Sequence, residues 1–212
     1  MKLTIQTFQQ LNNIAQSDLE DVDKAIEFVR IFTGKTAEQV DKMNVKKFNR
    51  LCKKVLDIFE KSMQKVNDEK PSNWMWVKGK LFYINYSIAE ISANKYVETA
   101  IFSQNLIDNL HKVMATMVYE TEWTWKGVKV KPYDSSKHEK ISNLMLQADF
   151  RHCYHVAVFF YQLLRNSIVN LRPFMEAEAE NPQKVAEALT DFTKTMDGLP
   201  MPKWCQNLKV SV

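Results

Sequence analysis

Apolar residues recur at helical spacing over most of the chain, most clearly between about residues 45 and 66. There the apolar side chains stand three or four positions apart, in the order Val45, Phe48, Cys52, Val55 and Phe59. The lysines of this segment fall largely on other sides of the predicted helix and include Lys46, Lys47, Lys53 and Lys54. This spacing predicts a long amphipathic surface helix, and Asn44 is placed to cap its first turn.

Further helices follow from the same periodicity. We expect them at about residues 18–32, 36–43, 92–119 with a break near Ser103, 135–148, 151–171 and 181–196. The segment between Tyr154 and Leu164 is apolar almost all round, so its helix is expected at the centre of the core.

Residues that start and stop helices support these boundaries. Ser17 or Asp18 is expected to cap the helix at 18–32, and Gly34 is placed to end it in the left-handed conformation. Thr36 and Gln39 have the spacing of a capping box, which predicts a short helix directly afterwards.

Two short segments rich in aromatic residues break the helical pattern. Each contains a Lys-Gly pair, Lys78-Gly79 or Lys126-Gly127, between runs with strand composition. This predicts β-hairpins at about residues 74–84 and 122–131. Each hairpin contains a tryptophan pair, Trp74 with Trp76 and Trp123 with Trp125. Because side chains alternate along a strand, each pair is expected on one strand face, where it either packs on the helices or forms an exposed interface anchor. Because an isolated hairpin is marginally stable, we expect the two to pair with each other or with a neighbouring subunit.

Together these elements predict a mainly α fold, a helical bundle with two short β-hairpins as a minor β component. Residues 1–172 are expected to form the core domain with both hairpins. Residues 173–212 are expected to add a C-terminal helix and an extended arm that carries Trp204, either packed or as a docking peptide.

Composition is that of a globular protein without a membrane span. Hydrophobic residues make up 45% of the chain and charged residues 25%. The longest apolar run, residues 156–161, is far shorter than the roughly 20 residues that cross a bilayer. The N-terminus lacks the apolar region of a secretory signal, and three scattered cysteines suit a reducing compartment.

Charge is unevenly distributed along the chain. Residues 42–70 hold nine Lys and Arg against four Asp and Glu, whereas residues 173–197 hold six acids against two lysines. The two stretches either pair within the chain, pair head-to-tail between copies, or form separate solvated helix faces. We hypothesise the pairing between copies.

Motifs of catalysis or cofactor binding are missing from the sequence, so we expect neither an enzyme nor a cofactor. Four glycines cannot supply a phosphate-binding loop, and no nucleophile elbow or zinc-protease motif occurs. The densest group of metal-ligand residues is His152-Cys153 with His155, and a zinc site there would also need His111 or His138. We therefore expect helix-end and core histidines and no metal.

Nucleic-acid binding is a further alternative, because the segment from Lys46 to Lys65 is basic. The aromatic residues of that segment, Phe48 and Phe59, belong to its apolar stripe, which favours core packing over base stacking. Direct contact with DNA is therefore not favoured, and it would consist mostly of non-specific phosphate contact.

The order of these features resembles the tailed-phage tail-assembly-chaperone-like and related virion head–tail structural proteins. The resemblance is carried by the helix before Thr33-Gly34-Lys35-Thr36 and by the short helix containing Gln39-Val40-Asp41-Lys42-Met43. The hairpin at Gly79, the hairpin that ends before Pro132-Tyr133-Asp134, and the aromatic helix at 156–164 follow in the same order. The likeness spans about residues 20–172.

This resemblance implies a non-enzymatic structural or assembly protein of a phage virion, assembled in the host cytoplasm and placed at the portal, head–tail or tail region. Its partners would be portal, connector or tail subunits and further copies of itself in a ring or multi-subunit complex, with no membrane. The alternatives are a monomeric chaperone or adaptor that binds its partner transiently and, third, a protein that contacts nucleic acid non-specifically. The expected interface residues are the four hairpin tryptophans, Trp204 and Lys46, Lys47, Lys53 and Lys54.

Overall fold

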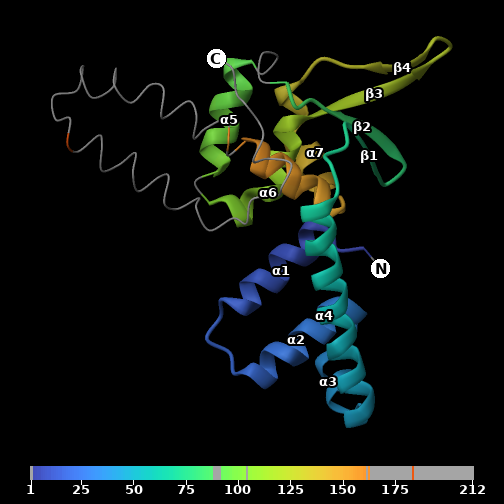
Figure 1. Cartoon of the computed structure of the whole chain (residues 1–212), viewed down its shortest axis with the longest axis vertical. Helices are drawn as coiled ribbons and strands as arrows, with labels where there is room; N and C mark the ends of the chain where they lie inside the picture. The colour runs from blue at the N-terminus through green and yellow to red at the C-terminus, as the bar shows by residue number, and fades with distance from the viewer. Residues whose placement is uncertain (1, 88–91, 104, 161, 163–182, 184–212) are drawn as a thin grey trace.

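A computed structural model describes residues 2–87, 92–103, 105–160, 162 and 183 (Figure 1). These residues form a mainly helical fold with one small antiparallel sheet, which confirms the predicted fold class. The expected helix at 181–196 and the arm with Trp204 lie almost entirely outside the described residues, as does the acidic stretch at 173–197. Among the described residues, none of the helices has the length and apolar content that a bilayer crossing requires.

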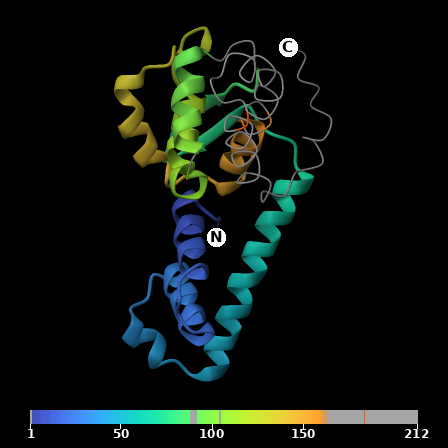
Figure 2. The same cartoon turned by 90° about the vertical axis from the view of Figure 1, so that its left-hand side faces the viewer.

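The first four helices form an N-terminal lobe, drawn in blue and teal in Figure 1. They are α1 (Ile5–Ala15), α2 (Asp21–Thr33), α3 (Ala37–Asp41) and α4 (Val45–Asp68). Figure 2 shows α4 standing beside the other three and running up to the rest of the molecule. The predicted long helix is therefore confirmed, and it links the lobe to the body.

Local capping explains most boundaries in this lobe. Gly34 ends α2 with φ at 67°, Thr36 and Gln39 form the predicted capping box, and the Asn44 side chain accepts a hydrogen bond from the Lys46 N–H at 2.9 Å. The predicted cap of α2 is wrong. The Ser17 hydroxyl donates to the Ile14 carbonyl at 2.6 Å, so Ser17 closes α1, and α2 begins only at Asp21.

No helix was expected at α1. It begins at the Thr4 side chain, which accepts from the Thr7 N–H, and it is held by contacts distant in sequence. The Phe150 N–H donates to the Leu3 carbonyl at 2.9 Å, and the rings of Phe8 and Phe150 stack with centroids 3.9 Å apart. These contacts attach the start of the chain to the centre of the fold.

The body contains α5 (Ala93–Ser103), α6 (Leu106–Met117), a 3-10 turn (Ser135–Lys137) and α7 (His138–Met145). The break near Ser103 is confirmed. A further helix occupies residues 150–160 and is called the central helix; Phe150, Val156, Phe159 and Phe160 in it are at most 2% exposed. Its buried position confirms the prediction as far as residue 160.

The sheet joins both predicted hairpins in the order β1 (Trp74–Val77), β2 (Lys80–Ile84), β3 (Val118–Thr124) and β4 (Gly127–Val130), with all neighbours antiparallel. The hairpins thus pair with each other, through β2 and β3. The second hairpin begins at Val118 instead of about residue 122, because residues 118–120 pair with β2 instead of extending α6.

One side of the sheet lies against the helices. Met75, Val77, Phe82, Ile84 and Val118 point to this side and are each at most 2% exposed. Because neighbouring strand residues point to opposite sides, the residues between them lie on the other side of the sheet.

Candidate protein-docking surfaces

The outward side of the sheet carries aromatic and other uncharged side chains. The register pairs Trp74 with Tyr83 and Tyr83 with Tyr119, so these three residues lie side by side across β1, β2 and β3. The outward positions, which we call the aromatic face, are Trp74, Trp76, Leu81, Tyr83, Tyr119, Thr121, Trp123, Val128 and Val130. None of the nine is charged. The strands therefore concentrate their charged residues on the side away from this face.

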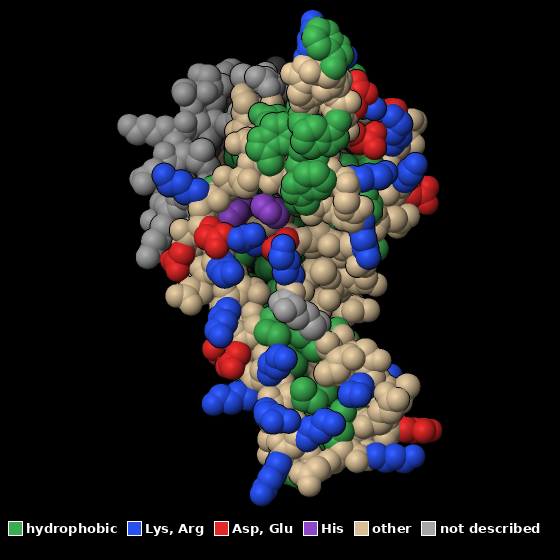
Figure 3. Space-filling view, turned by 90° about the vertical axis from the view of Figure 1, so that its right-hand side faces the viewer, with side chains coloured by type: hydrophobic (Ala, Val, Ile, Leu, Met, Phe, Trp, Pro, Cys, Tyr) green, Lys and Arg blue, Asp and Glu red, His purple; other side chains and the backbone are tan. Residues whose placement is uncertain are grey.

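The tryptophans of both hairpins are exposed, so the alternative that they pack in the core is wrong. Trp74 is 43% exposed, Trp76 61%, Trp123 70% and Trp125 89%. Trp123 and Trp125 were expected on one strand face, but Trp125 lies in the turn beyond the end of β3. Figure 3 shows hydrophobic side chains gathered over the upper part of the molecule, where the sheet lies. An interface role for these residues remains a prediction.

The tryptophans leave a substantial apolar surface exposed. Taking about 250 Å² for a whole indole residue, the three that lie on the aromatic face, Trp74, Trp76 and Trp123, expose about 435 Å². The largest apolar patch on a typical monomer is about 300–600 Å² and is often functional. An area in this range is consistent with a binding role.

Aromatic rings on neighbouring strands of the face contact one another from β1 to β3. The ring centroids of Trp74 and Tyr83 are 5.0 Å apart in an edge-to-face arrangement, and those of Tyr83 and Tyr119 are 6.4 Å apart. Such pairs hold aromatic side chains in place and lower the conformational entropy that binding would cost.

The aromatic face ends at a buried lysine. Lys95 of α5 is 2% exposed, and its Nζ lies 3.5 Å from the ring centroid of Tyr119 and 4.5 Å from that of Tyr133. The Tyr133 hydroxyl donates to Glu98 Oε2 at 2.7 Å. Burial lowers the pKa of Lys95 to about 7, against the opposing effect of the Glu98 carboxylate. This cluster was not expected from the sequence, where its local signal is the spacing of Lys95 and Glu98, three positions apart on a helix.

Polar groups occupy the side of β3 and β4 opposite the aromatic face and the outer edge of β1. On the opposite side of β3 and β4, Lys131 bridges Glu122 at 2.9 Å, and this contact lowers the pKa of Glu122. At the outer edge of β1, the Ser72 hydroxyl donates to the Trp74 carbonyl at 2.9 Å and accepts from the Trp74 N–H at 3.2 Å. Ser72 therefore occupies backbone groups that an added strand would need.

The predicted basic residues lie on α4, far from the sheet. Lys46, Lys47, Lys53 and Lys54, called here the basic face, are all exposed, and within the described part of the chain none forms an ion pair. Lysines and arginines spread over the lower part of the molecule in Figure 3. The structure thus places the predicted interface residues on two separate surfaces, while their acidic counterpart at 173–197 lies outside the described residues.

Apolar hollows occur in the N-terminal lobe. A cavity of about 250 Å³ lies between α1, α2 and α4, and a second of about 550 Å³ adjoins it. They share Ala15, Phe28, Val55 and Leu56, of which Leu56 is 56% exposed. The basic residues of α4 do not line either hollow, so the two features do not form one charged groove.

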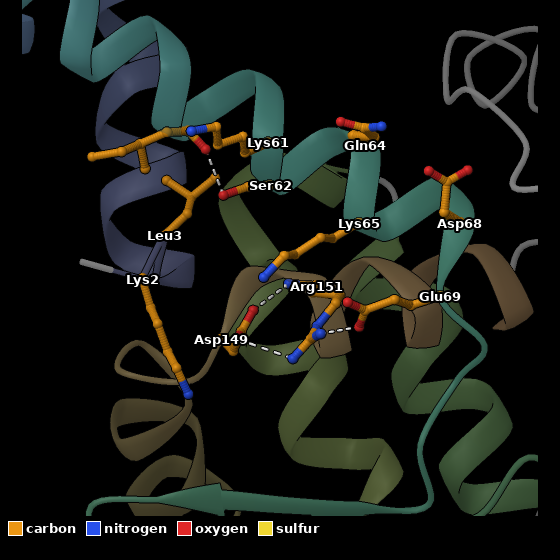
Figure 4. A pocket seen from close by; sticks show the side chains of 11 residues that line it. Lys2, Leu3, Lys61, Ser62, Gln64, Lys65, Asp68, Glu69, Asp149 and Arg151 are labelled. Carbon is orange, nitrogen blue, oxygen red and sulfur yellow. Dashed lines mark hydrogen bonds and ion pairs between the residues drawn. The ribbon is translucent and has the colours of Figure 1, made fainter.

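A hollow of about 500 Å³ lies where the end of α4 meets the body (Figure 4). Arg151 reaches across it to the carboxylates of Glu69 and Asp149, and its backbone N–H donates to Asp149 Oδ1 at 3.0 Å. The guanidinium is already paired with two carboxylates. We therefore assign it a structural role in joining α4 to the body.

Two of the residues considered for a metal site, Cys153 and His155, are buried in the core, whereas His152 is partly buried. Cys153 is fully buried, its thiol donates to the Leu110 carbonyl at 3.3 Å, and burial raises its pKa. His155 Nε2 donates to the Val66 carbonyl at 2.9 Å. Among the described residues, no group of three or more possible ligands gathers in one place.

Comparison with protein-family models, with curated proteins and with solved structures finds no match for this chain.

Proposed function

We propose that this chain is a non-enzymatic structural or assembly protein that acts by binding other proteins through its aromatic face. The observation that carries the proposal is the exposure of Trp74, Trp76 and Trp123 on a strand surface without charged residues. Tryptophan is among the residues that dominate the energy of protein interfaces, and rigid strands present it at a low entropic cost.

A protein partner accounts for this surface better than a nucleic acid does. Single-stranded nucleic acids are bound by aromatic side chains together with a basic groove that follows the phosphates. The aromatic face has no cation at its nine positions, and Lys129 and Lys131 lie on the opposite side of the sheet. The basic face of α4 belongs to the other end of the molecule.

Within this class, we propose a place in a tailed-phage particle, at the portal, the head–tail junction or the tail, in a ring or multi-subunit complex. The support is the order of elements: α2 ending at Gly34, the capped α3, the long α4, the two hairpins and the central helix. Its partners are then portal, connector or tail subunits.

The test uses the full chain, tagged and produced in the cells that make it, with Trp74→Ser/Trp76→Ser as the variant. Particles and assembly intermediates are purified, co-purifying proteins are identified, and binding to the purified partner is measured. We expect the wild type to bind and the variant to bind at least 100-fold more weakly.

The matched control is Glu122→Gln/Lys131→Gln, which removes an exposed ion pair from the opposite side of the sheet. Such a pair contributes under about 1 kcal/mol, so the control should fold and bind as the wild type does. Equal binding by all three proteins would refute the role of the aromatic face. Absence of the wild type from particles and assembly intermediates would refute the phage assignment.

A further inference from the structure

We propose that a second copy of this chain occupies the aromatic face, so that the β3–β4 hairpin of each copy lies on the β1–β2 strands of the other across a two-fold axis. This inference rests on the proposed function, because it names the partner of the same surface.

The hairpin at residues 121–130, called the hairpin arm, extends past the rest of the sheet. Only residues 118–120 of β3 pair with β2, whereas Thr121–Thr124 pair with β4. Figure 1 shows β3 and β4 extending beyond β1 and β2. A two-stranded ribbon with nothing packed on it is marginally stable, and covering one of its sides would stabilise it.

The two sides of the hairpin arm differ in charge, and this difference indicates which side a second copy would cover. One side carries Trp123 and Val130 and no charge, while the other carries the ion pair between Glu122 and Lys131. The charged side can stay in water at no cost, but the tryptophan side gains from burial. Trp125, in the turn at the tip, is 89% exposed, and the Lys126 amine lies 4.6 Å from its ring centroid.

The second half of the contact lies on β1, at the far edge of the sheet. Among the described residues, no ring contact joins Trp74 or Trp76 to Trp123 or Trp125 within one chain. A two-fold axis brings the hairpin arm of one copy to these residues of the other, and the reverse contact forms at the same time. The nine positions of the aromatic face carry no charge that these contacts would bury.

The exposed area favours a reciprocal pair over a single contact. If one hairpin arm on one β1–β2 surface buried the whole exposed area of the four tryptophans, about 650 Å² would be removed from water, which is the size of a non-specific packing contact. Two such contacts would remove at most about 1,300 Å², which reaches the lower end of the range of specific interfaces. Pairing through the β1 edge is disfavoured because Ser72 occupies both backbone groups of Trp74.

The experiment measures the mass of the full chain by light scattering over a concentration series from about 1 to 200 μM. We expect twice 24.8 kDa for the wild type. Two variants remove one half of each contact: Trp74→Ser/Trp76→Ser on the sheet and Trp123→Ser/Trp125→Ser on the hairpin arm. Each alone should be a monomer, with an unchanged circular dichroism spectrum because the replaced side chains are exposed.

Mixing the two variants provides the decisive result. The mixture restores one intact contact, between the hairpin arm of one variant and the sheet of the other, so a dimer should reappear at concentrations at least tenfold above those the wild type needs. Three results would overturn the two-fold pairing. The wild type could stay monomeric, it could form three or more copies, or it could dimerise while the mixture of the two variants does not. If the monomer still loses partner binding on Trp74→Ser/Trp76→Ser, the proposed function stands and only the second copy fails.

Discussion

The buried amine of Lys95 predicts how the stability of this protein depends on pH. Lysine in an unfolded chain has a pKa of about 10.4, whereas burial lowers the pKa of Lys95 to about 7. Between these values the unfolded state binds more protons than the folded state. The free energy of unfolding should therefore rise with pH from about 7 to about 10, by at most about 1.4 kcal/mol per pH unit from this residue. Below pH 7 both states are protonated, and the cost of burying the ammonium is present in full.

Replacement by a neutral side chain of similar length should remove this cost. The full window corresponds to on the order of 4 kcal/mol, and the contacts with Tyr119 and Tyr133 offset about 1 kcal/mol each because both rings favour the ammonium. Lys95→Met should thus raise the unfolding free energy by about 2–3 kcal/mol near pH 6.5. Glu98 still accepts the Tyr133 hydroxyl in the variant, so no buried carboxylate is left without a partner.

The assay is urea denaturation followed by circular dichroism, for wild type and Lys95→Met, at intervals from pH 6.5 to 10. The gain should shrink steadily as pH rises. The control is Lys112→Met. The amine of Lys112 lies 5.6 Å from the Phe102 ring centroid on a partly exposed side chain, and the stability of this variant is measured at the same pH values. Parallel pH curves for wild type and Lys95→Met, or a destabilised variant at pH 6.5, would refute the reasoning.

Three further predictions follow from other parts of the fold. Asn44→Ala removes the N-terminal cap of α4 and should lower the free energy of unfolding by about 1 kcal/mol, as measured by urea denaturation. An unchanged free energy of unfolding would show that this cap does not stabilise the helix. In a Cys205→Ser background, a thiol reagent should modify Cys52 in the native protein and Cys153 only on unfolding, because Cys153 is fully buried; equal rates would contradict that burial. If the basic face binds an acidic segment of a neighbouring copy or partner, assembly should weaken in high salt and when the lysines of this face are replaced by Glu. The replaced residues are Lys46, Lys47, Lys53 and Lys54. Assembly that neither change affects would exclude that contact.

Local signals predicted the elements whose ends depend on neighbouring residues. Gly34, Thr36 and Asn44 each act within one helical turn, so their residue types were sufficient to place the ends of α2, α3 and α4. In contrast, no helix was expected at α1, although Ile5, Phe8, Leu11 and Ile14 recur every three residues, and its position depends on pairing with residues 148–150. That contact joins segments more than 140 positions apart and leaves no local pattern.

The orientation of the sheet could not be predicted either. Alternation shows that Trp74 and Trp76 share a face, but Met75 and Val77 between them are equally apolar. The helices decide which face is covered, and they cover the one with the methionine and valine. The cluster around Lys95 depends in the same way on α5, β3 and the segment after β4 meeting in space.

The most direct test of the aromatic face as a docking surface is hydroxyl-radical footprinting of the four hairpin tryptophans. Oxidation of Trp74, Trp76, Trp123 and Trp125 is measured by mass spectrometry in the isolated chain at low concentration and in the purified native assembly. The free chain should be oxidised rapidly at all four, in line with exposed fractions of 43–89%, and the assembly should protect Trp74, Trp76 and Trp123 at least fivefold. Indoles that are oxidised as fast in the assembly as in the free chain would contradict the account.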